Sequence, residues 1–192
     1  MDISQHEEGL SEMQEVKRRF FALRNGIVAD TLRSNGSPFR IIFGLNLPQL
    51  KEIAAFTGEN RELAEALWNN TTTRESMMLA PMIFPREEFD EAHAQKWLDA
   101  SPSSEITDAL CHSMLRHRPY AQALALQRLK CAKNEHDAYG ALRLALNVVS
   151  RIDAEALRGA VDGLPSEIKA CPTILRLMRQ LEEELEFLAE SR

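Results

Sequence analysis

The middle of the chain carries a carboxylate and an imidazole at a spacing that could support chemistry. Asp108 and His112 are four residues apart, which places both side chains on one face of an α-helix. Such a pair could tune a proton transfer near neutral pH, whereas the simpler interpretation is a surface charge pair. An isolated buried aspartate is costly, so we expect Asp108 to be exposed on a concave face or paired.

A basic cluster follows at the end of the same expected helix. It consists of His112, Arg116, His117 and Arg118. These side chains either contact phosphate or complement the negative end of the helix dipole, which stabilises a helix by up to ~1 kcal/mol. His112 and His117 are five residues apart rather than four, and no zinc-binding pattern accompanies them. We therefore expect no metal at this cluster.

Other catalytic classes have no motif in this sequence. Phosphate-binding loops, dinucleotide fingerprints, zinc-peptidase motifs and serine-hydrolase elbows do not occur, so we expect no cofactor. Cys111, Cys131 and Cys171 are odd in number and widely spaced, which favours reduced thiols over a disulfide or zinc framework.

Composition narrows the class of protein. The 192 residues are 44% hydrophobic and 27% charged, enough for one globular domain with a sizeable core. The net charge of -6 argues against a general nucleic-acid binder, although a local basic patch can suffice. No apolar run reaches the ~20 residues of a membrane span, and the polar start at residues 1–9 does not resemble a signal peptide. We expect a cytoplasmic protein that does not bind membranes.

Helical periodicity recurs along almost the whole chain, and no segment alternates as a strand would. We expect a flexible leader at residues 1–10 and a single domain over residues 11–192. The expected helices cover residues 11–34, 47–57, 60–69, 73–83, 86–99, 103–116, 119–132, 135–151, 153–162 and 172–190.

Three of these helices begin at intervals of about one helix pair, near Thr72, Ser101 and Asn134. Thr72 and Glu75 have the spacing of a capping box, and Ser101 precedes a proline suited to a first helical turn. Each of the three helices is rich in small and apolar residues. They are predicted to be inner helices that line one groove of a HEAT-like or armadillo-type α-α superhelix, an all-α solenoid of antiparallel helix pairs.

The last expected helix has an apolar stripe and a strongly acidic opposite side. This pattern is typical of a terminal capping helix with a solvated face, and the alternative is a helix that forms a dimer or binds a partner.

Three segments resemble the AlkD-like family of DNA alkylation-repair glycosylases. Phe43–Lys51 is similar to the FGV-x-x-P-x-L-R-like entry of that family. Leu67-Trp68, followed by Arg74-Glu75, is similar to its LW…RE passage. Ser104–Asp108 falls where the family carries a W-D-x-V-D motif. The order and spacing of the three segments agree over roughly residues 12–150.

This resemblance implies a HEAT-like solenoid that holds duplex DNA and hydrolyses the N-glycosidic bond of positively charged alkylated purines. It assigns the catalytic carboxylate to Asp108, which would stabilise an oxocarbenium-like sugar without extrusion of the base. The catalytic arginine of the family has its best match in Arg143. The family tryptophan corresponds to Ser104 and the first aspartate of the motif to Glu105, so an aromatic wall against the lesion is missing.

The leading hypothesis is therefore a DNA glycosylase that excises 3-methyladenine or 7-methylguanine, with Asp108 stabilising the sugar cation and Arg143 holding the backbone. The residues expected to contact DNA are Arg74, His112, Arg116, His117 and Arg118. The alternative is a non-catalytic HEAT-repeat module that binds a protein partner in the same groove. The acidic net charge and the missing tryptophan favour the alternative, whereas Asp108 and the basic cluster favour the enzyme.

Overall fold

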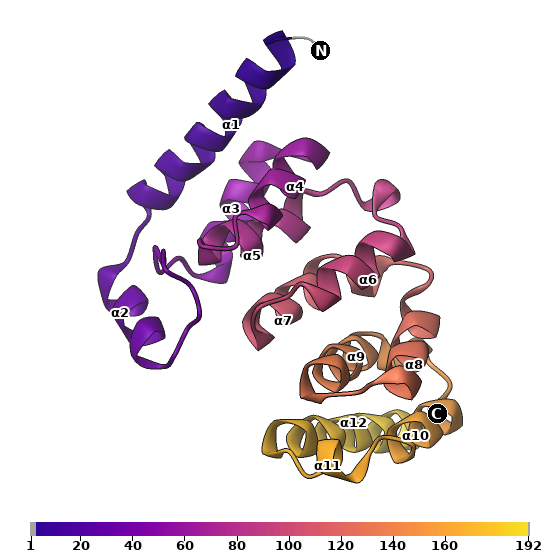
Figure 1. Ribbon diagram of the computed structural model, residues 1–192. Coiled ribbons are helices and arrows are strands. Elements are labelled where there is room, and N and C mark those ends of the chain that lie inside the picture. The colour runs from indigo at the N-terminus through magenta and orange to yellow at the C-terminus, as the bar shows by residue number, and fades with distance from the viewer. Residues whose placement is uncertain (1–2, 192) are drawn as a thin grey trace. The chain divides into compact units, whose positions relative to one another are not determined.

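The computed structural model describes the backbone of residues 3–191 and the side chains of residues 12–191 (Figure 1). All regular secondary structure in this part of the chain is helical, and the β-pairing found there is one isolated bridge between Ile41 and Thr73. The prediction of an all-α protein is confirmed. None of the described helices is long and apolar enough to cross a membrane.

The contacts between residues divide the chain into two compact units, Met1–Phe89 and Asp90–Arg192. Each unit is described separately. The single domain over residues 11–192, and a groove shared by all three predicted inner helices, stay predictions.

The first unit contains five α-helices and a short 3-10 helix within its described residues. Their bounds are α1 Ile3–Ala22, α2 Gly26–Ser34, α3 Leu47–Thr57, α4 Arg61–Asn69, α5 Arg74–Ile83 and η1 Arg86–Glu88. Helix α1 begins within the expected leader of residues 1–10. Residues 1–2 and the side chains of residues 3–11 lie outside the described residues.

The prediction of one helix over residues 11–34 was wrong, because the chain leaves the helix after Ala22. Asn25 begins a new one, and its side-chain oxygen accepts a hydrogen bond from the N–H of Val28 at 3.2 Å. Asparagine is among the residues most favoured at the position before a helix, because its side chain can accept from a free N–H of the first turn. The apolar residues keep a helical spacing on both sides of this break, so periodicity alone predicts one uninterrupted helix.

Helix α5 is the centre of the first unit, since all of its residues except Met82 are buried. It packs against α3 and α4. A helix that is buried on every side exposes no charged side chain to water. Its charged residues therefore need hydrogen-bond partners inside the protein.

Glu75, on the first turn of α5, does not form the predicted capping box. Thr73 precedes the helix and makes no side-chain capping bond. The fully buried Glu75 carboxylate instead accepts hydrogen bonds from the backbone N–H groups of Phe43, Gly44 and Leu45, at 3.0, 2.9 and 3.3 Å. These amides lie in a loop of irregular backbone, and the carboxylate supplies the acceptors that the loop lacks.

Gly44, in this loop, is conformationally required. Its φ is +78°, and a Cβ placed on it would stand 2.2 Å from the backbone oxygen of Asn25. Gly36 has a similar φ of +80° but nothing within 4 Å of the corresponding point. We expect Gly36→Ala to lower the free energy of unfolding by about 1 kcal/mol, through backbone strain alone.

The same strain applies to Gly44→Ala, and the clash with the backbone adds to it. We therefore expect a loss of about 3 kcal/mol or more, measured by urea unfolding of both variants. Equal losses in the two variants would contradict the close approach of Asn25 to Gly44.

The second unit is a stack of helix pairs. Its elements are α6 Glu91–Asp99, α7 Ser104–Ser113, η2 Leu115–His117, α8 Ala121–Cys131, α9 Glu135–Val148, η3 Val149–Arg151, α10 Ala154–Asp162, α11 Ser166–Lys169 and α12 Pro172–Glu190. Helix α9 packs against α7, α8 and α12, while α8 also packs against α10. Successive pairs that bury a shared core in this way are typical of helical repeats.

Four expected helices of this region are clearly shorter than predicted, and the one expected over residues 119–132 spans Ala121–Cys131. The one expected over residues 86–99 is interrupted between η1 and α6, and those expected over 103–116 and 135–151 end at Ser113 and Val148. In the last two, a 3-10 turn replaces the end of the α-helix, as is common at helix C-termini.

Candidate active site

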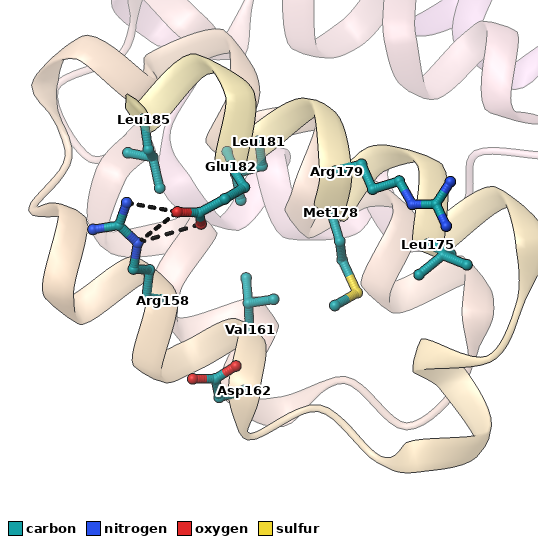
Figure 2. A pocket seen from close by; sticks show the side chains of 9 residues that line it. All are labelled: Arg158, Val161, Asp162, Leu175, Met178, Arg179, Leu181, Glu182 and Leu185. Atoms are coloured by element: carbon teal, nitrogen blue, oxygen red, sulfur yellow. Dashed lines mark hydrogen bonds and ion pairs between the residues drawn. The ribbon is translucent and has the colours of Figure 1, made fainter. Parts of the chain in front are cut away.

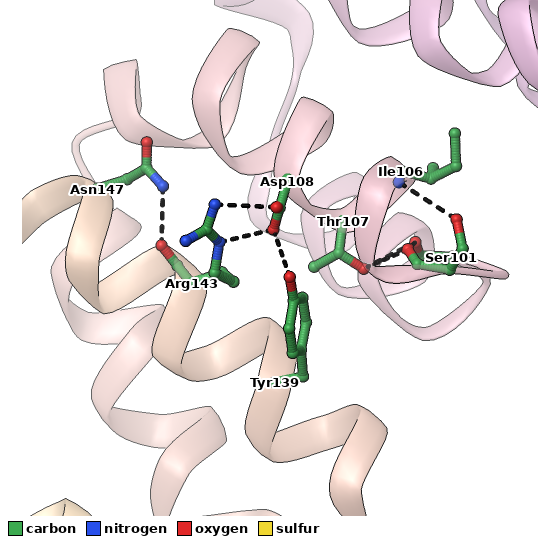
Figure 3. Close-up of polar contacts among 8 residues, drawn as sticks. Ser101, Ile106, Thr107, Asp108, Tyr139, Arg143 and Asn147 are labelled. Atoms are coloured by element: carbon green, nitrogen blue, oxygen red, sulfur yellow. Dashed lines mark hydrogen bonds and ion pairs between the residues drawn. The ribbon is translucent and has the colours of Figure 1, made fainter. Parts of the chain in front are cut away.

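Helices α7 and α9 position the candidate catalytic side chains. Ser103, rather than the predicted Ser101, caps α7, and its hydroxyl accepts a hydrogen bond from the N–H of Ile106 at 3.4 Å. The Ser101 hydroxyl instead lies 2.9 Å from that of Thr107 (Figure 3). Asn134 caps α9 as predicted, through the N–H of Asp137 at 2.9 Å. Both helix starts are thus held by local hydrogen bonds.

Asp108 on α7 and Arg143 on α9 form a two-point ion pair (Figure 3). Arg143 donates from Nε to Oδ1 of Asp108 at 2.6 Å and from Nη2 to Oδ2 at 2.9 Å. Both side chains are partly exposed, at 26% for the arginine and 35% for the aspartate. Burial opposes the charge of Arg143, but the hydrogen bonds and the charge of Asp108 outweigh it and raise its pKa. The structure therefore brings together the two residues that the sequence analysis assigned to catalysis.

Tyr139 is a third member of this site, and the sequence analysis missed it. Its hydroxyl donates to Oδ1 of Asp108 at 2.9 Å. Burial, followed by the charge of Asp108, raises the pKa of this hydroxyl, so it stays a neutral donor at neutral pH. The available signal was its position four residues before Arg143, on the same face of α9.

A second contact joins the turns that follow these two helices. Arg151 in η3, which follows α9, donates a hydrogen bond to the backbone carbonyl of Arg116 in η2, which follows α7. This contact brings a second group of cations together near the C-terminal ends of α7 and α9.

That group contains three of the residues predicted to contact DNA. Arg116 donates from Nε to Nε2 of His117 at 3.1 Å, and its Nη1 lies 3.3 Å from Nδ1 of His112. Both histidines are exposed, and so is Arg151, which the sequence analysis did not select. From here on, the name basic cluster means His112, Arg116, His117 and Arg151, because Arg118 is buried.

A model of the DNA alkylation repair enzyme family matches residues 16–162, well over half of the chain. The chain belongs to the DNA alkylation repair enzyme family. The matched residues include Asp108, Tyr139, Arg143 and the basic cluster. Searches among curated proteins and among solved structures give no match. Membership in this family supports a role in DNA alkylation repair.

In this family member, two of the residues predicted to contact DNA are buried. Arg74 is only 5% exposed, and its Nη1 donates to the carbonyl of Leu45 at 3.1 Å and to Glu75 at 2.8 Å. Arg118 is 9% exposed and lies over the ring of Tyr120. Their packing removes both guanidinium groups from the surface, so neither can contact a DNA phosphate in this structure.

A cavity of about 420 Å³ lies between α10 and α12 (Figure 2). Apolar side chains such as Val161, Met178 and Leu185 line it, together with the ion pair of Arg158 and Glu182. Its lining does not include Asp108, so it is separate from the candidate active site of this repair-family protein. The described residues contain no group of three or more side chains that could hold a metal ion.

Proposed function

We propose that this protein is a DNA glycosylase that excises positively charged alkylated purines, such as 3-methyladenine and 7-methylguanine, from duplex DNA. The observation that carries the proposal is the partly exposed Asp108 carboxylate, held by Arg143 and Tyr139 in a member of a DNA alkylation repair family. The basic cluster, near the C-terminal ends of the same two helices, supplies positive charge for the DNA backbone.

The proposed reaction needs a carboxylate but no strong general acid. An alkylated purine already carries a positive charge, so its bond to C1′ of the sugar breaks with the electron pair going to the departing base. The sugar becomes oxocarbenium-like, and a nearby carboxylate stabilises that charge or orients the attacking water. Water then forms a bond to C1′ and releases a proton to solvent. Asp108 fits the carboxylate role because it is both ionisable and accessible.

Arg143 fits a role in holding the DNA backbone. A guanidinium binds a phosphate in the same two-point manner as it binds a carboxylate. The ion pair of Arg143 with Asp108 is partly exposed, so a DNA phosphate can reach the arginine and compete with the carboxylate for the same donors.

The basic cluster fits phosphate binding through its arginines. Among the described residues, no carboxylate forms an ion pair with Arg116 or Arg151, although the chain has 29 acidic residues. Arg151 donates to the backbone carbonyl of Arg116, which is an uncharged acceptor, so an anion can still bind its guanidinium. The phosphates of DNA are such anions, and their neutralisation by arginine releases counterions.

The first test of the cluster is Arg151→Gln. We expect it to weaken binding to undamaged duplex DNA and to lower the slope of log affinity against log salt by about 0.9, which corresponds to one lost phosphate contact. Fluorescence anisotropy at several salt concentrations measures both quantities. The matched control is Arg128→Gln, because Arg128 pairs with Asp99 at 2.7 Å on the same unit. A salt slope that Arg151→Gln leaves unchanged would rule out its phosphate contact.

The test of the function is the release of 3-methyladenine or 7-methylguanine from alkylated duplex DNA by the wild-type chain. Release supports the glycosylase. The absence of release, together with the absence of salt-dependent DNA binding, would support the non-catalytic protein-binding module. The net charge of -6 and the serine at position 104 are the observations that favour that second function.

A further inference from the structure

The two oxygens of the Asp108 carboxylate are held differently. Oδ1 accepts two hydrogen bonds, one from Arg143 Nε at 2.6 Å and one from the Tyr139 hydroxyl at 2.9 Å. Oδ2 accepts a hydrogen bond from Arg143 Nη2 at 2.9 Å. If Arg143 moved away, Tyr139 would still hold Oδ1, whereas Oδ2 could contact another group (Figure 3).

We propose that Tyr139 is a positioning residue, which holds Oδ1 of Asp108 while Arg143 exchanges from this carboxylate to a DNA phosphate. The exchange turns Oδ2 from a partner of Arg143 into the oxygen that faces the developing sugar cation. The proposal rests on the glycosylase function and adds to it a step by which the DNA backbone exposes the charge of Asp108.

The need for such a residue follows from charge. A carboxylate in a two-point ion pair has most of its charge neutralised, so it stabilises a nearby cation poorly. Once Arg143 leaves, that charge becomes available, but the side chain loses the two hydrogen bonds from Arg143 and keeps the one from Tyr139. A freely rotating carboxylate gives up the preorganisation on which electrostatic catalysis depends.

Tyr139 has the properties that this task requires. Its phenol is neutral, so it orients Asp108 without cancelling the carboxylate charge. Burial and the nearby carboxylate raise the pKa of its hydroxyl, so the donated proton stays on the tyrosine. Its ring is half-buried and has few rotatable bonds, which limits the entropy lost in fixing it.

The experiment compares Tyr139→Phe with Tyr120→Phe in the full chain. These are the only two tyrosines, and Tyr120 donates to the backbone carbonyl of Asp90 at 2.9 Å rather than to Asp108. We expect Tyr139→Phe to lower the single-turnover rate of 7-methylguanine release by roughly 10- to 100-fold, the usual effect of one hydrogen bond to a charged group. The Kd for the same DNA should change less than about twofold, because the lost bond is to Asp108 and not to DNA. Tyr120→Phe should change neither quantity.

A double-mutant cycle separates positioning from a general structural effect. If Tyr139 acts through the Asp108 carboxylate, Tyr139→Phe should cause no further loss of rate in an Asp108→Asn background. The proposal would be overturned if the rate reductions of the two substitutions multiplied in the double variant. It would also be overturned if Tyr139→Phe alone kept the wild-type rate.

A second readout does not depend on glycosylase activity. With ¹³C-labelled aspartate, Tyr139→Phe should shift the carboxylate resonance of Asp108 in the free protein, and Tyr120→Phe should leave it in place. If the wild-type chain releases no base, the proposed function fails, and this resonance alone decides the inference. An unshifted resonance in Tyr139→Phe would then overturn it.

Discussion

Replacing Asp108 by asparagine should reduce the rate of alkylated-base release by about 100- to 1,000-fold, in the range observed when one group that stabilises transition-state charge is removed. Asparagine has nearly the same size and keeps an acceptor oxygen for Tyr139. It carries no charge, so it cannot stabilise the oxocarbenium-like sugar. The expected loss is in kcat rather than in DNA affinity, because the sugar is charged only as the glycosidic bond breaks.

The measurement is single-turnover release of 3-methyladenine and 7-methylguanine, with thermal unfolding followed in parallel. The matched control is Asp99→Asn, since Asp99 also pairs with an arginine, Arg128, at 2.7 Å in the same unit. That control loses an aspartate–arginine pair but should keep full activity. Unchanged release by Asp108→Asn in a folded chain would remove Asp108 from the catalytic role.

Replacing Glu75 by alanine should lower the free energy of unfolding by about 3–5 kcal/mol, the typical result of removing one partner of a buried ion pair. The change removes the acceptor of three backbone N–H groups and of Arg74, which is itself buried. Four donors would then lie in the protein interior without this carboxylate, and each unsatisfied donor carries a desolvation cost.

Urea unfolding measures this loss, and amide hydrogen exchange locates it. We expect the amides of Phe43, Gly44 and Leu45 to exchange faster in the variant, because their acceptor is gone. Glu65→Ala is the control, since Glu65 is 44% exposed, pairs with Arg61 within one helix, and should cost less than about 0.5 kcal/mol. A loss in Glu75→Ala as small as in this control would show that the buried network contributes little.

The Glu75 network also explains two of the motifs that pointed to the family. The segment beginning at Phe43 and the pair Arg74-Glu75 are about thirty residues apart, yet the carboxylate of one holds the amides of the other. Their joint occurrence therefore has a structural cause in the first unit, independent of any DNA contact. The motif on which the proposed chemistry depends is the one ending at Asp108.

Helix positions were largely readable from the sequence because their signals are local. The helices expected over residues 47–57 and 172–190 have those bounds in the structure, and each has a proline in its first turn. The break at Asn25 was also encoded locally, but the continuing apolar period outweighed it. Capping and periodicity involve residues within a few positions of one another, so a sequence determines them by itself.

The partners of the charged residues were decided only by the tertiary structure. Glu75 has the spacing of a capping box, but in the buried helix α5 its carboxylate accepts hydrogen bonds from a loop about thirty residues away. Arg74 and Arg118 have the residue type of DNA contacts, but packing buried them. Residue types and the family resemblance selected Asp108 and Arg143, whereas the packing of α7 on α9 joined them and brought in Tyr139. Such pairings depend on which helix faces meet and how deeply they are buried, and no local pattern encodes that.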